Sequence, residues 1–150
     1  MHSRVLGVLA GDRLKPEWLR PWVDSADVVI AADAGADFVV AADRVPAVLV
    51  GDLDSVSEKT RQIVPLVAEH QEQESSDCDK LLAHVRSMGS ESVTLCGAEG
   101  RRIDHMVATL GSAARSDLRV TIAYEEMIAY VLRGPVDIRL AHQGLVSLLP

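Results

Sequence analysis

The sequence predicts a three-layer α/β/α domain built on a mostly parallel β-sheet, and two observations lead to this fold class. The first is a series of short Val, Leu, Ile and Ala runs without polar alternation, of which residues 48–50 are an example. Such runs are typical of strands that are buried on both faces, as in parallel sheets. The second is that these runs alternate with segments of helical periodicity. Alternation of this kind places helices on both faces of a parallel sheet.

The predicted elements follow one another at short intervals. The expected strands are residues 4–10, 27–32, 47–50, 66–70 and 92–96. The expected helices are residues 17–23, 36–42, 55–64, 77–87 and 104–114. Two local signals support the helix starts, because Pro16 suits a first helical turn and Ser55 and Glu58 have the spacing of a capping box. The order of the elements predicts a Rossmann-like arrangement.

The pattern changes after Leu118, where helical segments give way to short predicted strands. These strands are residues 120–123, 127–132, 136–140 and 145–149. We therefore divide the chain into an α/β domain of residues 1–125 and a β-rich tail of residues 126–150. The tail could supply antiparallel edge strands to the same sheet, or it could open a second domain.

Composition and charge narrow the classes of function. The chain has 150 residues and is 48% hydrophobic, which is enough for a single buried core. Its net charge of −7 argues against a surface for nucleic acid or anionic membranes. No apolar stretch approaches the roughly 20 residues that a membrane-spanning helix needs, and the N-terminus lacks the profile of a signal peptide. Cys78 and Cys96 have no paired spacing, which indicates a reducing cytoplasm. Together with the charge and the hydropathy, this predicts a cytoplasmic protein without nucleic-acid or membrane partners.

Acidic side chains follow successive predicted strands. Asp52 and Asp54 come directly after the strand of residues 47–50, and two carboxylates this close repel each other unless a cation compensates. Asp33 follows the preceding strand, and Asp77 begins a helix. Because parallel strands end at one edge of the sheet, these carboxylates can converge and offer the oxygen ligands that Mg²⁺ prefers. Asp33 and Asp77 could instead be helix N-caps.

A loop containing glycine and arginine follows the strand of residues 92–96. Its Arg102 carries a planar guanidinium group that can reach a phosphate. At the start of the next predicted helix, Asp104 could cap the helix, and His105 could act as a general base or make a structural hydrogen bond. Together with the acids, this loop predicts metal-assisted transfer of a phosphoryl or pyrophosphoryl group.

Four stretches of the sequence resemble the N-terminal catalytic domain of thiamine pyrophosphokinases, in the order and at the spacing of that family. They are residues 32–36, 51–55, 74–80 and 97–105. The resemblance implies transfer of pyrophosphate from ATP to the hydroxyl group of thiamine, which gives thiamine diphosphate and AMP. It also implies Mg²⁺ as the cofactor, ATP as the co-substrate, and a homodimer with sites at the subunit interface.

The family's pattern also implies roles for individual residues. The Mg²⁺-binding and catalytic carboxylates would be Asp33, Asp52, Asp54 and Asp77. The residues that bind nucleotide or substrate would be Gly51, Ser55, Ser76, Lys80, Gly97, Gly100, Arg102, Asp104 and His105. Residues 143–150 resemble the opening of the family's C-terminal thiamine-binding β-domain, so we expect that domain to be missing or truncated in this chain.

Other functions stay open at this point. Residues 52–56 also fit the nucleophile motif of haloacid-dehalogenase-type phosphatases, which act on phosphate esters. A Mg²⁺-dependent pyrophosphokinase that acts on another small alcohol, such as a pterin alcohol, would use the same acids. The chain also differs from the family's usual residues at Ala34, Glu74, Ser76, Arg101 and Thr109. These differences and the short length leave room for a catalytically inactive nucleotide-binding or assembly module.

Overall fold

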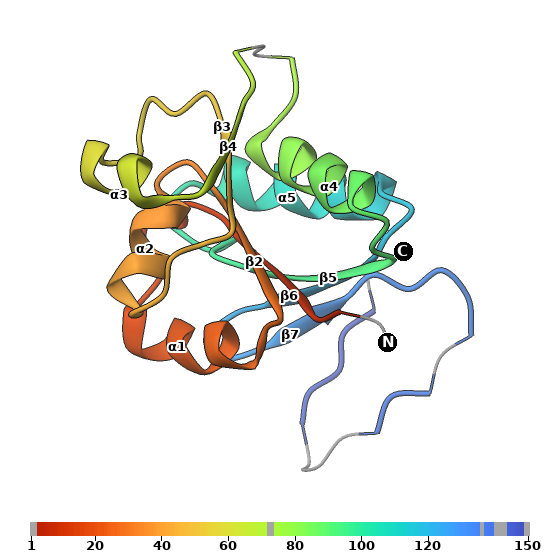
Figure 1. Ribbon diagram of the computed structural model, residues 1–150. Helices are drawn as coiled ribbons and strands as arrows, with labels where there is room; N and C mark the ends of the chain where they lie inside the picture. The colour runs from red at the N-terminus through yellow and green to blue at the C-terminus, as the bar shows by residue number, and fades with distance from the viewer. Residues whose placement is uncertain (1–2, 72–73, 136, 140–143, 149–150) are drawn as a thin grey trace.

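The computed structural model describes residues 3–71, 74–135, 137–139 and 144–148, and it shows an α/β domain around a seven-stranded sheet (Figure 1). The strands are β1 (Val5–Val8), β2 (Val28–Ala32), β3 (Val48–Gly51), β4 (Leu66–Glu69), β5 (Ser92–Cys96), β6 (Arg119–Ala123) and β7 (Ile128–Tyr130). The helices are α1 (Pro16–Ser25), α2 (Gly35–Ala41), α3 (Glu58–Ile63), α4 (Asp77–Ser87) and α5 (Ile103–Arg115). The strand order is β4-β3-β2-β1-β5-β6-β7, and every neighbouring pair is parallel except β6 and β7.

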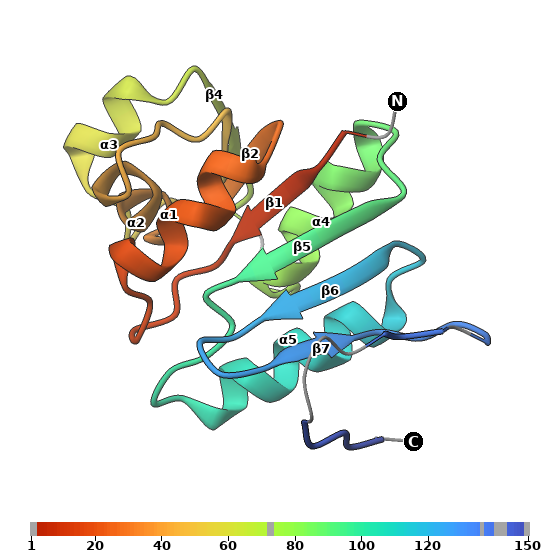
Figure 2. The ribbon, with the colours of Figure 1, turned by 90° about the horizontal axis from the view of Figure 1, so that it is seen from below.

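Helices cover both faces of the sheet. Helices α4 and α5 lie on one face, and α1 and α2 lie on the other (Figures 1 and 2). Successive residues of β1 divide between the two apolar cores, because Val5 packs in the core with α4 and α5 whereas Leu6 and Val8 pack in the core with α1 and α2. Burial on both faces explains why the strands lack polar alternation. The structure confirms the predicted three-layer fold with a mostly parallel sheet.

Helix α4 packs closely on the centre of the sheet because β1 carries a glycine there. A Cβ atom on Gly7 would lie only 2.7 Å from Cδ2 of Leu81, a fully buried residue of α4. The Leu81 side chain therefore fills the space that a larger residue at position 7 would take. This contact sets the separation between the sheet and α4, whose first residue is Asp77.

The tail of residues 126–150 begins as part of the same sheet. Strand β7 pairs with β6 in a register that places Tyr130 opposite Thr121, so the strand predicted at 127–132 exists in shortened form as an antiparallel edge strand. None of the described residues 137–139 and 144–148 lies in a strand, so the strands predicted at 136–140 and 145–149 are wrong there.

After β7 the chain turns away from the sheet, and a hydrogen bond of Arg133 accounts for the turn. Arg133 donates a hydrogen bond to the carbonyl oxygen of Ala114 at 3.0 Å, which draws the chain towards the end of α5 instead of along the sheet edge. Gly134 and Pro135 follow directly, and both residues disfavour a continuing strand. The remaining parts of the two predicted strands, at Val136, Leu140 and Leu149, lie outside the described residues.

One helix starts later than predicted. Helix α3 begins at Glu58 and has Ser57 as its N-cap, whose Oγ accepts a hydrogen bond from the N–H group of Thr60 at 3.3 Å. The predicted capping residue, Ser55, instead accepts a long hydrogen bond from the N–H group of Ala34 at 3.4 Å. Ser55 is therefore held at the N-cap of α2, and the prediction that it caps α3 is wrong.

Two further features describe the chain as a whole. Within the described ranges, no helix has both the length and the apolar character that crossing a bilayer requires. Cys78 and Cys96 are free thiols, and burial raises the pKa of each to about 12. Both side chains are thus neutral packing residues of the interior.

Candidate functional site

A cleft lies where the strand order of the sheet reverses. Strands β1 and β5 are neighbours, but the chain proceeds from β1 towards one edge of the sheet and from β5 towards the other. The loops that follow these two strands therefore diverge, and open α/β sheets bind ligands at such a point. The cleft has a volume of about 350 Å³ and is bordered by these loops, by Asp52 and by the N-terminal turns of α4 and α5.

Three of the predicted acids meet beside the cleft. One carboxylate oxygen each of Asp33, Asp52 and Asp54 lies within 4.8 Å of the other two. Asp33 follows β2 and is only 3% exposed, whereas Asp54 follows β3 and is exposed. The exposure of Asp52 is intermediate between those of Asp33 and Asp54, and Asp52 lines the cleft. The acid cluster of Asp33, Asp52 and Asp54 therefore borders the cleft through Asp52.

The fourth predicted acid, Asp77, is the first residue of α4. Ser76 is the N-cap of this helix and forms a capping box with Asp79, so the capping role considered for Asp77 belongs to Ser76. Asp77 lines the cleft, and its carboxylate is close enough to interact electrostatically with Asp33 and Asp54. The structure thus brings all four predicted acids to one edge of the sheet.

The backbone around the acid cluster adopts conformations that are rare for residues with side chains. Asp33 has a φ of 45° and Leu53 a φ of 68°, both in the left-handed region. Gly51 has a φ of 137°, and a Cβ atom there would lie 2.4 Å from the Asp33 carboxylate. That carboxylate accepts a hydrogen bond from the N–H group of Leu53 at 2.8 Å and therefore does not cap α2, whose N-cap is Ala34. Such strain is concentrated where loops aim functional groups.

The electrostatics of the cluster favour a bound cation. Burial raises the pKa of Asp33 to about 7, and the negative charges of Asp77 and Asp52 act in the same direction. The negative charge of Asp52 likewise raises the pKa of Asp54. Crowded carboxylates with raised pKa values are stabilised by a positive charge among them. Because every donor atom in the set is a carboxylate oxygen, the cluster suits a hard cation such as Mg²⁺.

The loops after β1 and β5 are joined to each other at the cleft. Gly97 has a φ of 77°, and a Cβ atom there would lie 2.2 Å from the carbonyl oxygen of Leu9, so only glycine permits this approach. On the other side, the Asp12 carboxylate accepts a hydrogen bond from the N–H group of Arg101 at 2.9 Å. The path of the glycine-containing loop is thus determined by the loop after β1.

Sequence reasoning missed two residues of this site. Gly11 and Asp12, which follow the first predicted strand, both line the cleft. The signal that could have identified them is a Gly-Asp pair directly after a buried strand, the same arrangement that drew attention to Gly51 and Asp52.

Most of the predicted nucleotide-binding residues line the cleft. They are Ser76, Lys80, Gly97, Gly100, Arg102 and His105. Lys80 is only 6% exposed, and its Nζ donates a hydrogen bond to the carbonyl oxygen of His70 at 3.3 Å. Arg102 is exposed and donates a hydrogen bond to Asp104 at 2.5 Å, so Asp104 joins the site through Arg102. Gly51 and Ser55 lie at the acid cluster instead.

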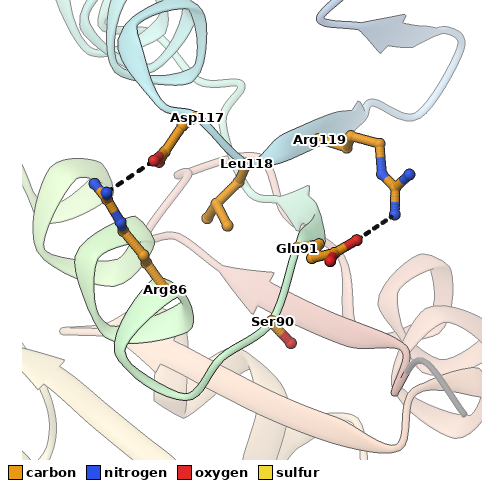
Figure 3. Close-up of a pocket in the computed structure, with 6 residues that line it drawn as sticks. All are labelled: Arg86, Ser90, Glu91, Asp117, Leu118 and Arg119. Carbon is orange, nitrogen blue, oxygen red and sulfur yellow. Dashed lines mark hydrogen bonds and ion pairs between the residues drawn. The ribbon is translucent and has the colours of Figure 1, made fainter.

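A second pocket lies at the opposite edge of the sheet, before β5 and β6 (Figure 3). It has a volume of about 310 Å³, and two ion pairs border it. Arg86 pairs with Asp117 at 2.9 Å, and Arg119 pairs with Glu91 at 3.3 Å. Because it lies at the amino ends of the parallel strands, it is separate from the acid cluster and the cleft.

The strand order and the cleft at its reversal define a doubly wound α/β domain. Residues 19–123 match the family described as thiamin pyrophosphokinase, catalytic domain. The match covers more than half of the 150 residues, and the chain belongs to this family. No curated protein sequence matches the chain.

Solved structures of the same family have a similar fold. The chain is 25% identical to a thiamin pyrophosphokinase from Geobacillus thermodenitrificans, with a TM-score of 0.67 over 79% of this chain and 58% of the other. A thiamin pyrophosphokinase family protein from Enterococcus faecalis is also 25% identical, with a TM-score of 0.62 over 81% and 61%. The thiamine pyrophosphokinase from Bacillus subtilis is 20% identical, with a TM-score of 0.65 over 80% and 60%. The chain therefore spans about three fifths of the length of these proteins.

The raised pKa of Asp33 predicts a pH dependence of stability in metal-free protein. Its carboxyl group is protonated more readily in the folded state, where the pKa is about 7, than at its ordinary value of 3.8. This difference stabilises the folded state fully below about pH 4, and the stabilisation is lost as the pH rises through about 7. Urea denaturation in EDTA should therefore show that Asp33→Asn abolishes part of the stability loss between pH 5 and pH 8. Parallel profiles for the two proteins would contradict the prediction.

Gly97 and Gly89 provide a matched test of the contact between the two loops. Their φ values are 77° and 76°, but a Cβ atom at Gly89 would meet nothing within 4 Å. Alanine at either position should add roughly 1–2 kcal/mol of backbone strain. At position 97, its Cβ atom should also clash with the carbonyl oxygen of Leu9. We expect Gly97→Ala to lower the free energy of unfolding by more than about 1 kcal/mol beyond the loss from Gly89→Ala. Equal losses in urea denaturation would show that the loops are not in close contact.

Proposed function

We propose that this chain transfers pyrophosphate from ATP to the hydroxyl group of thiamine, which gives thiamine diphosphate and AMP. Membership of the family supports the reaction class. The observation that carries the proposal is the acid cluster of Asp33, Asp52 and Asp54, which borders, through Asp52, a cleft at the strand-order reversal. Phosphoryl-transfer proteins need this combination, because their catalysis consists mainly of positioning and charge neutralisation.

Mg²⁺ is the proposed cofactor, and Asp33, Asp52 and Asp54 would hold it with Asp77 beside them. When bound, Mg²⁺ neutralises the charge of the phosphate groups and of the transition state. The chain's own contribution is to aim these carboxylates at one place. The hydrogen bond from Leu53 favours the charged form of Asp33 and offsets part of the effect of burial, and a bound cation would favour the charged form further.

The cleft would place ATP next to the acid cluster. The loop that contains Gly97 and Gly100 borders the cleft, so its backbone is within reach of a nucleotide bound there. Lys80 and Arg102 supply positive charge along the same cleft for the phosphate groups. In the reaction, the thiamine hydroxyl oxygen forms a bond to the β-phosphorus while the bond from that phosphorus to AMP breaks. A carboxylate of the cluster accepts the hydroxyl proton.

We further propose that the protein works as a homodimer in the cytoplasm. Exposed apolar side chains support a contact between subunits, among them Ile103 and Val107 of α5, which are 70% and 60% exposed. The two free thiols, Cys78 and Cys96, support a reducing compartment.

The decisive experiment is to incubate the protein with ATP, Mg²⁺ and thiamine and to follow the formation of AMP. AMP and thiamine diphosphate in equal amounts support the proposal. AMP formed only with another alcohol would change the acceptor, and free phosphate without AMP would favour a phosphatase. If turnover is absent but ATP with Mg²⁺ raises the melting temperature, the chain is a nucleotide-binding module.

Asp54→Asn tests the acid cluster without a change of shape. We expect it to weaken Mg²⁺ binding by more than about 100-fold, because loss of a direct ligand should exceed the 10–100-fold effect typical of outer partners. AMP formation should fall accordingly, while the circular dichroism spectrum stays that of the native protein. Asp24→Asn, which removes an exposed carboxylate of α1, is the control. Isothermal titration with Mg²⁺ gives the comparison, and unchanged affinity in Asp54→Asn would rule out the site.

A further inference from the structure

The loop between β3 and α3, residues 52–57, is bound to the segment of residues 33–37 at three successive points. We call residues 52–57 the acid loop, because it carries Asp52 and Asp54. The N–H group of Leu53 donates to Asp33 at 2.8 Å, the N–H group of Ala34 donates to Ser55 at 3.4 Å, and Ser57 donates to Asp37. The acid loop therefore lies along the start of α2 for its whole length.

The third of these attachments is made by Asp37 alone. One of its carboxylate oxygens accepts the N–H group of Ser57 at 3.0 Å, and the other accepts the Ser57 hydroxyl at 2.5 Å. The same hydroxyl oxygen accepts the N–H group of Thr60 as the N-cap of α3. Ser57 thus joins the end of the acid loop to both α2 and α3.

The Asp37 carboxylate is built to stay charged in this position. Burial acts against ionisation, but hydrogen bonds from Ser57 and Thr60 outweigh it and hold the pKa of Asp37 below its usual value. A hydrogen bond to an ionised carboxylate is roughly twice as strong as a bond between neutral groups. Both bonds from Ser57 therefore end on an ionised carboxylate, which strengthens this attachment of the acid loop.

The acid loop needs an attachment at its far end. Its beginning is held by β3 and by the bond from Leu53 to Asp33, but Leu53 itself is strained at a φ of 68°. Residues in such conformations keep them only where the surrounding structure imposes them. Asp54 follows Leu53 directly and is exposed, so its own burial does not hold it in place. Without a fixed end at Ser57, the strain at Leu53 could relax and carry Asp54 away from Asp33 and Asp52.

We propose that Asp37 is a positioning residue of the candidate Mg²⁺ site, which fixes the end of the acid loop and thereby holds Asp54 in the acid cluster. This inference rests on the proposed function, because it assigns Asp37 a role at the same site. Asp37 lies four residues after Asp33, in the first turn of α2, so one short segment carries both a proposed ligand and the attachment of the acid loop. Asp37 is not itself one of the clustered acids.

The test is the affinity for Mg²⁺, measured by isothermal titration. Asp37→Ala should raise the dissociation constant about 10–100-fold, the range typical of groups that orient metal ligands. Asp37→Asn, which keeps one acceptor oxygen, should restore part of the affinity. Asp43→Asn is the matched control, because Asp43 lies just beyond the other end of α2 and forms an exposed ion pair with Arg20. An unchanged dissociation constant in Asp37→Ala, or an equal rise in Asp43→Asn, would overturn the proposal.

A double-mutant cycle with Ser57→Ala separates positioning from general destabilisation. If Asp37 acts through Ser57, the two substitutions together should weaken Mg²⁺ binding no more than Asp37→Ala does alone. Independent effects would add, and an additive result would overturn the proposal. In the AMP assay, the Mg²⁺ concentration for half-maximal rate should rise while kcat at saturating Mg²⁺ stays near that of the wild type. If Asp37 had only a structural role, its substitution would lower the amount of folded protein but leave the Mg²⁺ concentration for half-maximal rate unchanged.

Hydrogen exchange in metal-free protein tests the attachment independently of the proposed function. The amides of Leu53 and Ser57 should exchange at least about tenfold faster in Asp37→Ala than in the wild type, because both lie in the acid loop. Unchanged exchange would overturn the proposal. If the wild type binds no Mg²⁺, the proposed function fails, and exchange still decides whether Asp37 holds the loop. Should Asp37→Ala not fold, Ser57→Ala carries the same measurements.

Discussion

The hydrogen bond from the N–H group of Leu53 to Asp33 joins the carboxyl ends of β2 and β3, and the geometry of the acid cluster depends on it. It requires a carboxylate buried where a side chain at position 51 would otherwise lie, so Gly51 is a condition for it. It also requires Leu53 to adopt a left-handed conformation, which places Asp52 and Asp54 on either side of the bond. This arrangement crowds the carboxylates together, and a bound cation would relieve the repulsion between them.

The parallel sheet explains how residues distant in sequence form one site. Asp33, Asp52 and Gly97 each come directly after a strand, and β2, β3 and β5 end at the same edge of the sheet. The reversal of strand order between β1 and β5 then opens a cleft next to the acids. The site therefore needs little more from each loop than a suitable residue in its first few positions.

Sequence reasoning predicted the features that depend on residues close together in the chain. The buried strands and the placement of Asp52 and Asp54 after one of them depend on neighbouring residues, so both were accessible. Asp37 was not, because its partner Ser57 lies 20 residues away and an acid in a first helical turn looks ordinary. Glycine and aspartate after β1 were overlooked for a similar reason, since the contact of Asp12 with Arg101 spans 89 residues.

Two errors in the prediction also have physical causes. Ser55 and Ser57 both precede α3. The spacing to Glu58 favoured Ser55, whereas contacts with the N-cap and first turn of α2 decide between them. The apolar residues at 145–149 suggested a strand, but Leu145 is 97% exposed and the described part of this segment has no strand beside it. A strand pattern becomes a strand only where a neighbouring strand accepts its backbone hydrogen bonds.

The packing of Leu81 against Gly7 affects the electrostatic potential at the candidate site. Because β1 has no side chain at that point, α4 can lie close to the sheet, and its first residue, Asp77, interacts electrostatically with Asp33 and Asp54 of the acid cluster. The backbone dipoles of a helix sum to a partial positive charge at the N-terminus, and an α4 of 11 residues directs this field at the acid cluster and the cleft. A glycine in the apolar core, with no polar side chain of its own, thereby tunes the potential that an anionic ligand meets at the edge of the sheet.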